Sequence, residues 1–346
     1  MEQIIKAKPK FNFTKCILII FKRSIEIVQY FYEMAISLFD KSVRIAFTNF
    51  WSDLSPSFFI RPFITDNFFK YKIVKYYNPD IQFFSVFGDI KKLKNSKSHV
   101  KIFYTGENVN TISNTEYIGN CIDSVNLSLG FDYCDAANYI RFPIWLLYFF
   151  SHDNSKDDIK LILNNFKTQI NKTKFCALVS RHDKSGLRTK MYNAISQLGN
   201  VDCPGKILHN DNTLHKVYNN DKLQYLQQYK FNICPENTSS DGYVTEKIFQ
   251  SLYSGCIPIY SGWSKNPEPD IINPDIIMWY DEFDDENNKC MIEEIKKLHE
   301  NDKLYRSFMA QPYFCDTAVD KIYEFLFLYN SKILYLMEKH IKKAAL

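Results

Sequence analysis

Polar side chains with complementary chemistry lie close together in the second half of the chain. Lys247 falls in the first turn of a predicted helix, where free backbone amides and the helix dipole favour an anion. Tyr243 and Asn237 add neutral hydrogen-bond donors from the preceding loop, and Glu246 offers a hydrogen-bond acceptor. Arg188 begins a predicted helix in the preceding unit, and its guanidinium can bridge two phosphate oxygens. The pattern indicates a phosphate-binding site made of side chains.

The stretch 229–263 supplies the elements that would position these residues. Residues 231–234 and 256–260 are short apolar runs typical of buried strands. Between them, a polar loop precedes apolar residues at helical spacing, and Gly255 follows as the residue that ends the helix. These apolar residues are Val244, Ile248 and Leu252. A strand, loop, helix and strand form the repeat of a parallel α/β sheet, in which ligands bind beyond the carboxyl ends of the strands.

The order of these residues resembles the donor-binding motif of the α1,3/4-fucosyltransferases, glycosyltransferase family 10, and is most similar to the bacterial type. The motif comprises Phe231, Glu236-Asn237, residues 243–248 (YVTEKI), residues 257–260 (IPIY) and Gly262. A lone Glu246-Lys247 pair would be more typical of an exposed first helical turn. The length and order of the whole motif therefore carry the resemblance.

A second part of the chain resembles the N-terminal domain of the same family. The run Thr105-Gly106-Glu107-Asn108 follows a predicted strand at 100–104 and is similar to a short Gly-Glu-Asn signature. The family pattern continues in residues 130–133 and 139–143. The resemblance thus spans the chain from about residue 43 to the helix after Trp263.

The resemblance implies that L-fucose is transferred from GDP-β-L-fucose to a hydroxyl of an acceptor glycan, with inversion to an α linkage. It implies an N-acetyllactosamine-type acceptor that is fucosylated α1,3 on GlcNAc. In this scheme Glu246 binds the ribose, and the diphosphate is bound by Lys247, Tyr243, Asn237 and Arg188.

Transfer with inversion also needs a base on the side of the sugar opposite the diphosphate. The resemblance assigns this role to Glu107, while Asp53 is the other acid at a predicted strand end of the first domain. The scheme requires no metal, because fixed cations can neutralise the leaving diphosphate. The carboxylates at 284–286 belong to a longer acidic run and are typical of a solvated surface.

These features predict an α/β protein with two Rossmann-like domains that face each other across a cleft, the GT-B glycosyltransferase fold. The first domain should contain strands at 43–47, 81–87, 100–104 and 120–125. A boundary is expected near residues 151–158, where polar residues replace an apolar run. The predicted division is an N-terminal helical extension at 1–41, an acceptor-side domain at 42–155, a GDP-fucose-binding domain at 156–317 and a C-terminal helix at 318–346.

Composition restricts the class of protein further. A length of 346 residues fits two domains, and a net charge of +4 indicates no nucleic-acid surface. The chain has only 10 glycines and no GxGxxG motif, so a glycine-rich phosphate loop is not expected. Its nine cysteines are widely spaced without a CxxC pair, which disfavours zinc and indicates a reduced, intracellular protein.

The N-terminal segment is amphipathic. Its apolar run at 16–21 is interrupted by Lys22 and Arg23 and falls far short of the ~20 apolar residues that a membrane span needs. Apolar residues then recur at helical spacing, which predicts a helix that packs on the protein, on a partner subunit or on a membrane surface. We therefore expect a cytoplasmic protein without a transmembrane span, open to peripheral membrane contact and to oligomer formation through its terminal helices.

Two alternative functions remain open at this point. A transferase of the same fold could use another GDP-sugar, because contacts with phosphate and ribose do not distinguish the sugar. A non-catalytic nucleotide- or glycan-binding module would keep Lys247 and could dispense with Glu107. The presence of both residues favours the enzyme.

Overall fold

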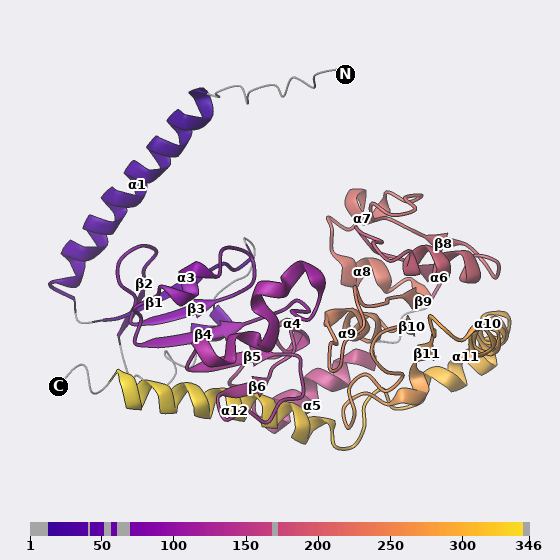
Figure 1. Cartoon of the computed structure of the whole chain (residues 1–346). Helices are drawn as coiled ribbons and strands as arrows, with labels where there is room; N and C mark the ends of the chain where they lie inside the picture. Colours follow the sequence, from indigo (N-terminus) through magenta and orange to yellow (C-terminus); the bar gives the residue numbers. More distant parts are fainter. Residues whose placement is uncertain (1–12, 41, 52–56, 61–69, 168–171, 342–346) are drawn as a thin grey trace, which may run out of the picture.

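The computed structural model describes residues 13–40, 42–51, 57–60, 70–167 and 172–341, and it contains two parallel β-sheets (Figure 1). The first sheet has the strand order β2 (Tyr71–Ile73), β1 (Val43–Thr48), β3 (Ile81–Phe84), β4 (Val100–Tyr104), β5 (Leu127–Gly130) and β6 (Tyr139–Arg141). The second has the order β11 (Met278–Trp279), β10 (Ile257–Tyr260), β9 (Tyr229–Ile233), β7 (Lys174–Ala177) and β8 (Val201–Asp202). Neighbouring strands pair in parallel in both sheets.

Helices and 3-10 turns (η) connect these strands. Up to the second sheet they are α1 (Phe13–Ser37), α3 (Lys91–Lys94), η1 (Ile112–Ser124), α4 (Trp145–Phe149), α5 (Lys156–Asn164) and η2 (Asn165–Lys167). The remainder are α6 (Leu187–Ile195), α7 (Thr213–Lys216), α8 (Lys222–Leu226), α9 (Glu246–Tyr253), η3 (Pro274–Ile276), α10 (Asp285–Glu300), α11 (Asp302–Met309) and α12 (Ala318–His340). This arrangement confirms the predicted α/β fold.

The central strands are apolar along nearly their whole length because parallel sheets are covered on both faces. In the first sheet, Ile45, Phe83 and Ile102 are almost completely buried. In the second sheet, Phe231 and Ile259 are completely buried. Burial of these runs leaves only the strand ends free to carry polar, functional residues.

One predicted strand is wrong. Residues 120–125 lie at the end of η1, and β5 begins only after them. Gly119, Asn120 and Cys121 have φ of 76°, 55° and 54°, a left-handed conformation that a strand does not contain. Asn120 holds this turn, since its Nδ2 donates to Asp132 (2.7 Å) and its carbonyl accepts from the Ser128 hydroxyl (2.6 Å). These partners lie 8 and 12 positions further along the chain, and the apolar pattern alone does not reveal polar contacts of this kind.

The two halves of the molecule are joined by buried contacts. The Arg141 guanidinium donates to both carboxylate oxygens of Glu268, at 3.0 and 2.9 Å, and both side chains are almost fully buried. The Trp145 indole donates to the same carboxylate at 2.7 Å and stacks on Phe249 of α9 with ring centroids 4.3 Å apart. Because these contacts link the end of the first sheet to elements of the second half, they fix the relative position of the two sheets.

The C-terminal helix α12 returns to the first half and runs along it (Figure 1). The Tyr329 hydroxyl donates to the Phe59 carbonyl at 3.3 Å, and Asn330 Nδ2 donates to the His152 carbonyl at 2.6 Å. The two sheets lie on either side of the expected boundary at 151–158. The division of the chain into domains, with its exact limits, stays a prediction.

Helix α1 stands away from the body of the protein (Figure 1) and contacts it through a polar interaction. The buried Glu33 carboxylate accepts hydrogen bonds from the backbone amides of Lys75, Tyr76 and Tyr77 at 3.1, 2.9 and 2.8 Å. The other faces of α1 expose apolar side chains such as Val28, which is 68% exposed. Among the residues that the model describes, no helix combines the length and apolar character needed to cross a membrane.

Candidate active site

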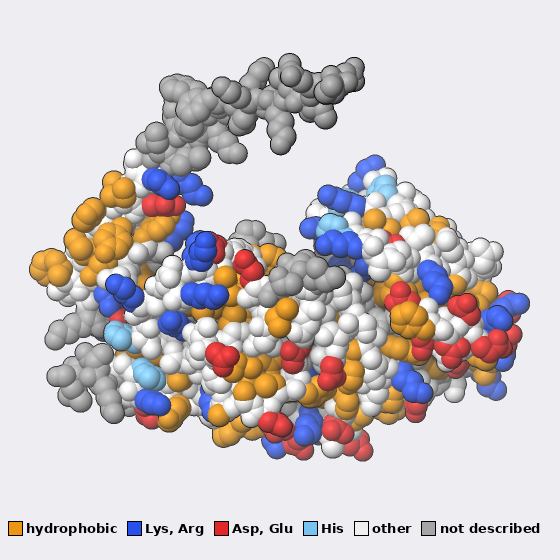
Figure 2. Space-filling view, in the orientation of Figure 1, with side chains coloured by type: hydrophobic (Ala, Val, Ile, Leu, Met, Phe, Trp, Pro, Cys, Tyr) orange, Lys and Arg blue, Asp and Glu red, His pale blue; other side chains and the backbone are white. Residues whose placement is uncertain are grey.

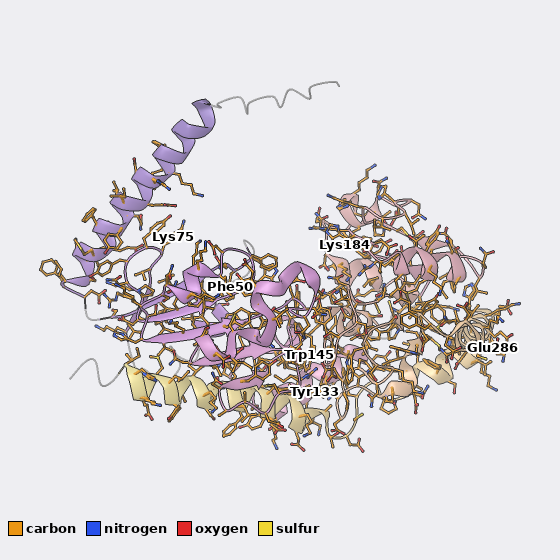
Figure 3. The ribbon with its side chains drawn as sticks, in the orientation of Figure 1. Phe50, Lys75, Tyr133, Trp145, Lys184 and Glu286 are labelled. Carbon is orange, nitrogen blue, oxygen red and sulfur yellow. The ribbon has the colours of Figure 1, made fainter. Side chains whose placement is uncertain are left out.

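The carboxyl ends of the two sheets meet between the two halves of the molecule. The loop after β4 and the loop after β9 are linked by a hydrogen bond from Asn108 Nδ2 to Thr238 Oγ1 at 2.8 Å. Figure 2 shows the surface hollowed between the first half and the tip of the second half that carries α7. Figure 3 places Phe50 and Lys184 on the two sides of this hollow. Residues from both sheets can therefore reach a ligand bound at this junction.

Lys247 lies in the first turn of α9, as the sequence predicts. Its Nζ donates to Glu236 at 3.0 Å and to the Thr245 hydroxyl at 2.8 Å. Burial alone would lower the pKa of Lys247, but the carboxylates of Glu236 and Glu246 outweigh it and raise the pKa above its ordinary value. The ammonium group therefore stays charged, and its third hydrogen remains available to an anion.

Glu236 is the residue whose role the sequence did not reveal, although it belongs to the recognised motif. Its side chain is 0% exposed. Besides Lys247, it accepts from the Thr245 amide (2.8 Å), the Thr245 hydroxyl (2.7 Å) and the Tyr260 hydroxyl (3.3 Å). A buried charge is stable only when it is paired and hydrogen-bonded, so Glu236 holds the start of α9 and Lys247 in place. The available signal was a glutamate shortly after the end of the apolar strand β9, which ends at Ile233.

Arg188 and Asn237, which the resemblance assigns to the same diphosphate, contact each other. Arg188 lies at the start of α6, and its Nη2 donates to Asn237 Oδ1 at 2.9 Å and to the Pro235 carbonyl at 3.3 Å. The Asp183 carboxylate accepts from the backbone amides of Arg188 and Thr189, at 3.0 and 2.9 Å, and thereby holds the turn that begins this helix. Burial lowers the pKa of Arg188. The guanidinium still keeps its charge, because the ordinary pKa of arginine is far above neutral pH.

Tyr243 is held between the two halves of the molecule. Its ring packs edge-on against Phe131 at 4.7 Å and is 2% exposed. Burial raises the pKa of Tyr243 well above its ordinary value, so the phenol is a neutral donor. The preceding Gly242 has φ 70°, and a Cβ there would lie 2.4 Å from the Phe131 carbonyl oxygen. Only glycine allows this close approach of the two backbones.

Glu246 is half-buried at the first position of α9. A second lysine that the sequence did not single out lies close to it. Lys222 donates from Nζ to Gln250 at 2.7 Å, and burial lowers the pKa of Lys222 while the nearby Glu246 carboxylate raises it. No motif surrounds Lys222, so only the folded chain brings it to the site.

Glu107 lies at the opposite side of the junction, in the turn after β4. The Thr105 hydroxyl accepts from the Glu107 amide at 3.0 Å and donates to the Glu107 carbonyl at 2.7 Å, which fixes the turn. Burial raises the pKa of Glu107, Lys247 lowers it, and Glu246 raises it further. The hydrogen bond from the adjacent Asn108 to Thr238 holds this turn next to the loop that precedes α9. Asp53, the alternative acid, lies outside the described residues.

The molecule has two parallel sheets whose carboxyl edges face each other, with cationic groups at one edge and a carboxylate at the other. This arrangement is typical of the GT-B class of glycosyltransferases. The family follows from two sequence models. Residues 168–314 match "Glycosyltransferase family 10 (fucosyltransferase) C-term", and residues 45–148 match "Alpha-(1,3)-fucosyltransferase FucT N-terminal domain". The chain belongs to glycosyltransferase family 10, and the resemblance seen in its motifs is confirmed.

Similar proteins share this family. The chain is 28% identical over 306 residues to the alpha-(1,3)-fucosyltransferase FucT of Helicobacter pylori, covering 78% of this chain and 60% of that protein. It is 35% identical over 115 residues to alpha-(1,3)-fucosyltransferase B of Drosophila melanogaster, covering 33% of this chain and 24% of the relative. The chain thus spans about 60% or less of these two relatives.

Crystal structures of alpha1,3-fucosyltransferases have a similar fold. A crystal structure of an alpha1,3-fucosyltransferase matches with a TM-score of 0.58 at 23% identity, covering 84% of this chain and 90% of that one. A crystal structure of an alpha1,3-fucosyltransferase with GDP-fucose matches with a TM-score of 0.54 at 24% identity, covering 84% of this chain and 90% of that one. At this level of identity the comparison establishes the fold, and the two-domain GT-B prediction is confirmed.

Proposed function

We propose that this chain transfers L-fucose from GDP-β-L-fucose to a hydroxyl of an acceptor glycan with inversion, forming an α1,3 linkage to GlcNAc of N-acetyllactosamine-type acceptors. The observation that carries the proposal is the hydrogen bond from Asn108 to Thr238, which joins the turn that carries Glu107, after β4 of the first sheet, to the loop between β9 and α9 of the second. Family membership supports GDP-fucose as the donor, and so does the similar fold of an alpha1,3-fucosyltransferase that was crystallised with GDP-fucose.

The second domain binds the donor in this proposal. Arg188 and Lys247 neutralise the charge that develops on the diphosphate when the bond to the sugar breaks. Asn237 and Tyr243 donate neutral hydrogen bonds to phosphate oxygens, and Glu246 accepts hydrogen bonds from the ribose hydroxyls. Because Lys247 is already held by Glu236 and Thr245, it loses little conformational freedom on binding.

The first domain supplies the base. Glu107 removes the proton from the acceptor hydroxyl as its oxygen forms a bond to the anomeric carbon of fucose, and the bond from that carbon to the diphosphate breaks on the opposite side. GDP leaves with the electron pair of the broken bond, and the proton remains on Glu107 until it passes to solvent. The raised pKa of Glu107 makes it a stronger base than an ordinary glutamate.

The proposal is tested by incubating the purified chain with GDP-fucose and a panel of acceptor disaccharides, and identifying the product linkage by NMR. We expect α1,3-fucosylated N-acetyllactosamine, with turnover that persists in EDTA because the scheme needs no metal. Parallel reactions with GDP-mannose and UDP-sugars should give no product. GDP binding without transfer to any acceptor would instead favour the non-catalytic alternative, and transfer of another sugar would identify a different donor.

A further inference from the structure

An aromatic pair lies beside Glu107 on the carboxyl edge of the first sheet. Trp51 follows β1 and Phe87 follows β3, and their ring centroids are 4.9 Å apart with an interplanar angle of 55°. Phe87 is 47% exposed, and Trp51 is partly buried. Because β1, β3 and β4 are neighbours in the sheet, these rings belong to the strand ends next to the Glu107 turn.

Trp51 abuts the turn that carries Glu107. A Cβ placed on Gly106 would lie 2.7 Å from Cη2 of Trp51 and 2.6 Å from Cδ1 of Ile144. The indole therefore covers the backbone of the residue immediately before Glu107, and only glycine leaves room for it. The Trp51 ring thus lies next to the turn that carries Glu107.

Neighbouring residues hold both loops of the aromatic pair in place. Phe50, next to Trp51, stacks on the buried Tyr104 with ring planes 11° apart. The Phe87 amide donates to the Asn49 carbonyl at 2.9 Å, which ties the loop after β3 to the loop after β1. An aromatic pair held in this way, with Phe87 exposed and Trp51 partly exposed, is preorganised for a ligand, whereas an isolated exposed ring would need no such support.

The chemistry of the pair points to a sugar ring. The flat C–H face of a pyranose packs against an aromatic ring, while its hydroxyls remain directed to polar groups at the edge. Sites that combine aromatic walls with a few polar groups bind such small, partly apolar ligands. The cationic groups that suit the diphosphate belong to the second half of the molecule, whereas the aromatic pair follows strands of the first sheet, so the two ligands would be bound by different halves of the molecule.

We propose that Trp51 and Phe87 form the acceptor platform, on which a pyranose ring of the acceptor glycan stacks beside the hydroxyl that Glu107 deprotonates. This inference rests on the proposed transferase function and adds the residues that bind the acceptor. Because Trp51 covers the backbone next to Glu107, the stacked ring is either the ring that carries the attacking hydroxyl or its immediate neighbour.

The variants Trp51→Ala and Phe87→Ala test the platform, with Phe283→Ala as the matched control because Phe283 is 92% exposed and lies on the second domain. Initial rates are measured with N-acetyllactosamine varied at saturating GDP-fucose. We expect each platform variant to raise the acceptor KM about tenfold, equivalent to about 1.4 kcal/mol. The KM for GDP-fucose and the rate of GDP-fucose hydrolysis without acceptor should stay within about twofold, and Phe283→Ala should match the wild type.

Milder variants guard against misfolding. Phe87→Leu keeps an apolar side chain and removes the flat ring, so it should weaken acceptor binding as Phe87→Ala does, while Phe87→Trp should retain it. An active wild type whose Trp51 and Phe87 variants keep the same acceptor KM would overturn the platform.

A second readout separates failure of the platform from failure of the proposed function. Saturation-transfer NMR with N-acetyllactosamine reports contact between the disaccharide and the protein without requiring turnover. We expect saturation of the ring protons in the wild type and its loss in Trp51→Ala. If the wild type transfers no fucose but shows this pattern, the proposed function is wrong and the platform stands. Absent saturation in the wild type, or equal saturation in Trp51→Ala, overturns the platform.

Discussion

Replacing Lys247 by methionine removes one partner of the buried ion pair with Glu236, whose side chain is fully buried at 3.0 Å from the ammonium nitrogen. Two effects must then be separated. The folded state is left with an unpaired buried carboxylate, and the proposed diphosphate site loses a cation. Breaking one side of a buried pair costs about 3–5 kcal/mol of unfolding free energy. Losing one charge-assisted contact to a phosphate costs about 1.5–3 kcal/mol of binding free energy.

The double variant Glu236→Gln/Lys247→Met separates them. Glutamine keeps the shape of the side chain and can still hydrogen-bond Thr245 and Tyr260, but it carries no charge to leave unpaired. We therefore expect Lys247→Met to lose about 3–5 kcal/mol of stability in urea unfolding and the double variant to recover most of it. GDP affinity should fall about 10- to 140-fold in both variants, because the cation is absent from both.

Isothermal titration calorimetry with GDP, at a temperature where both variants remain folded, measures the second effect. The double variant is the decisive sample, because its stability is close to that of the wild type. GDP binding of wild-type strength in this variant would refute the role of Lys247 in the donor site. Unchanged stability in Lys247→Met would refute the energetic coupling inferred from the buried pair.

Glu107→Gln should lower kcat at least about 100-fold with GDP affinity near normal; wild-type turnover in this variant together with an inactive Asp53→Asn would move the base to Asp53. Burial raises the pKa of Glu107 above the ordinary value of 4.5, and only the deprotonated carboxylate can accept the proton. The rate should therefore fall as pH drops through that raised pKa, and a pH–rate profile whose acid limb survives in Glu107→Gln would assign the limb to another group. Gly242→Ala should lose more stability in urea unfolding than Gly119→Ala, because both have positive φ but only the first places a Cβ 2.4 Å from the Phe131 carbonyl oxygen. The left-handed strain common to both is about 1–2 kcal/mol, and equal losses would show that the two backbones can separate at Gly242.

The local architecture of the donor side could be read from the sequence. The apolar runs around 231–234 and 256–260 became β9 and β10, and Lys247 lies in the first turn of α9 as expected. These features depend on hydrophobic periodicity and helix ends, which are properties of short stretches. Gly255 likewise has the positive φ of 69° that its place after the helix predicts.

Only the folded chain determined which groups of the site contact each other. The pairing of Glu236 with Lys247, the bond from Arg188 to Asn237 and the approach of Glu107 to α9 all depend on how separate strand ends meet. The sequence contained every one of these residues but not the distances between them, because each distance depends on sheet order and on the packing of the two halves.

The junction between the domains was also decided by tertiary structure. Arg141 and Glu268 lie 127 positions apart in the chain and form a buried pair that Trp145 completes. Arg141 falls within the family pattern at 139–143, but nothing in the sequence identifies Glu268 as its partner, because a buried glutamate and an exposed one look the same in a sequence. Sequence patterns predict local turns and the apolar faces of helices and strands, because these depend on short stretches of the chain. The pairing of buried charges depends on three-dimensional neighbours that only the complete fold brings together.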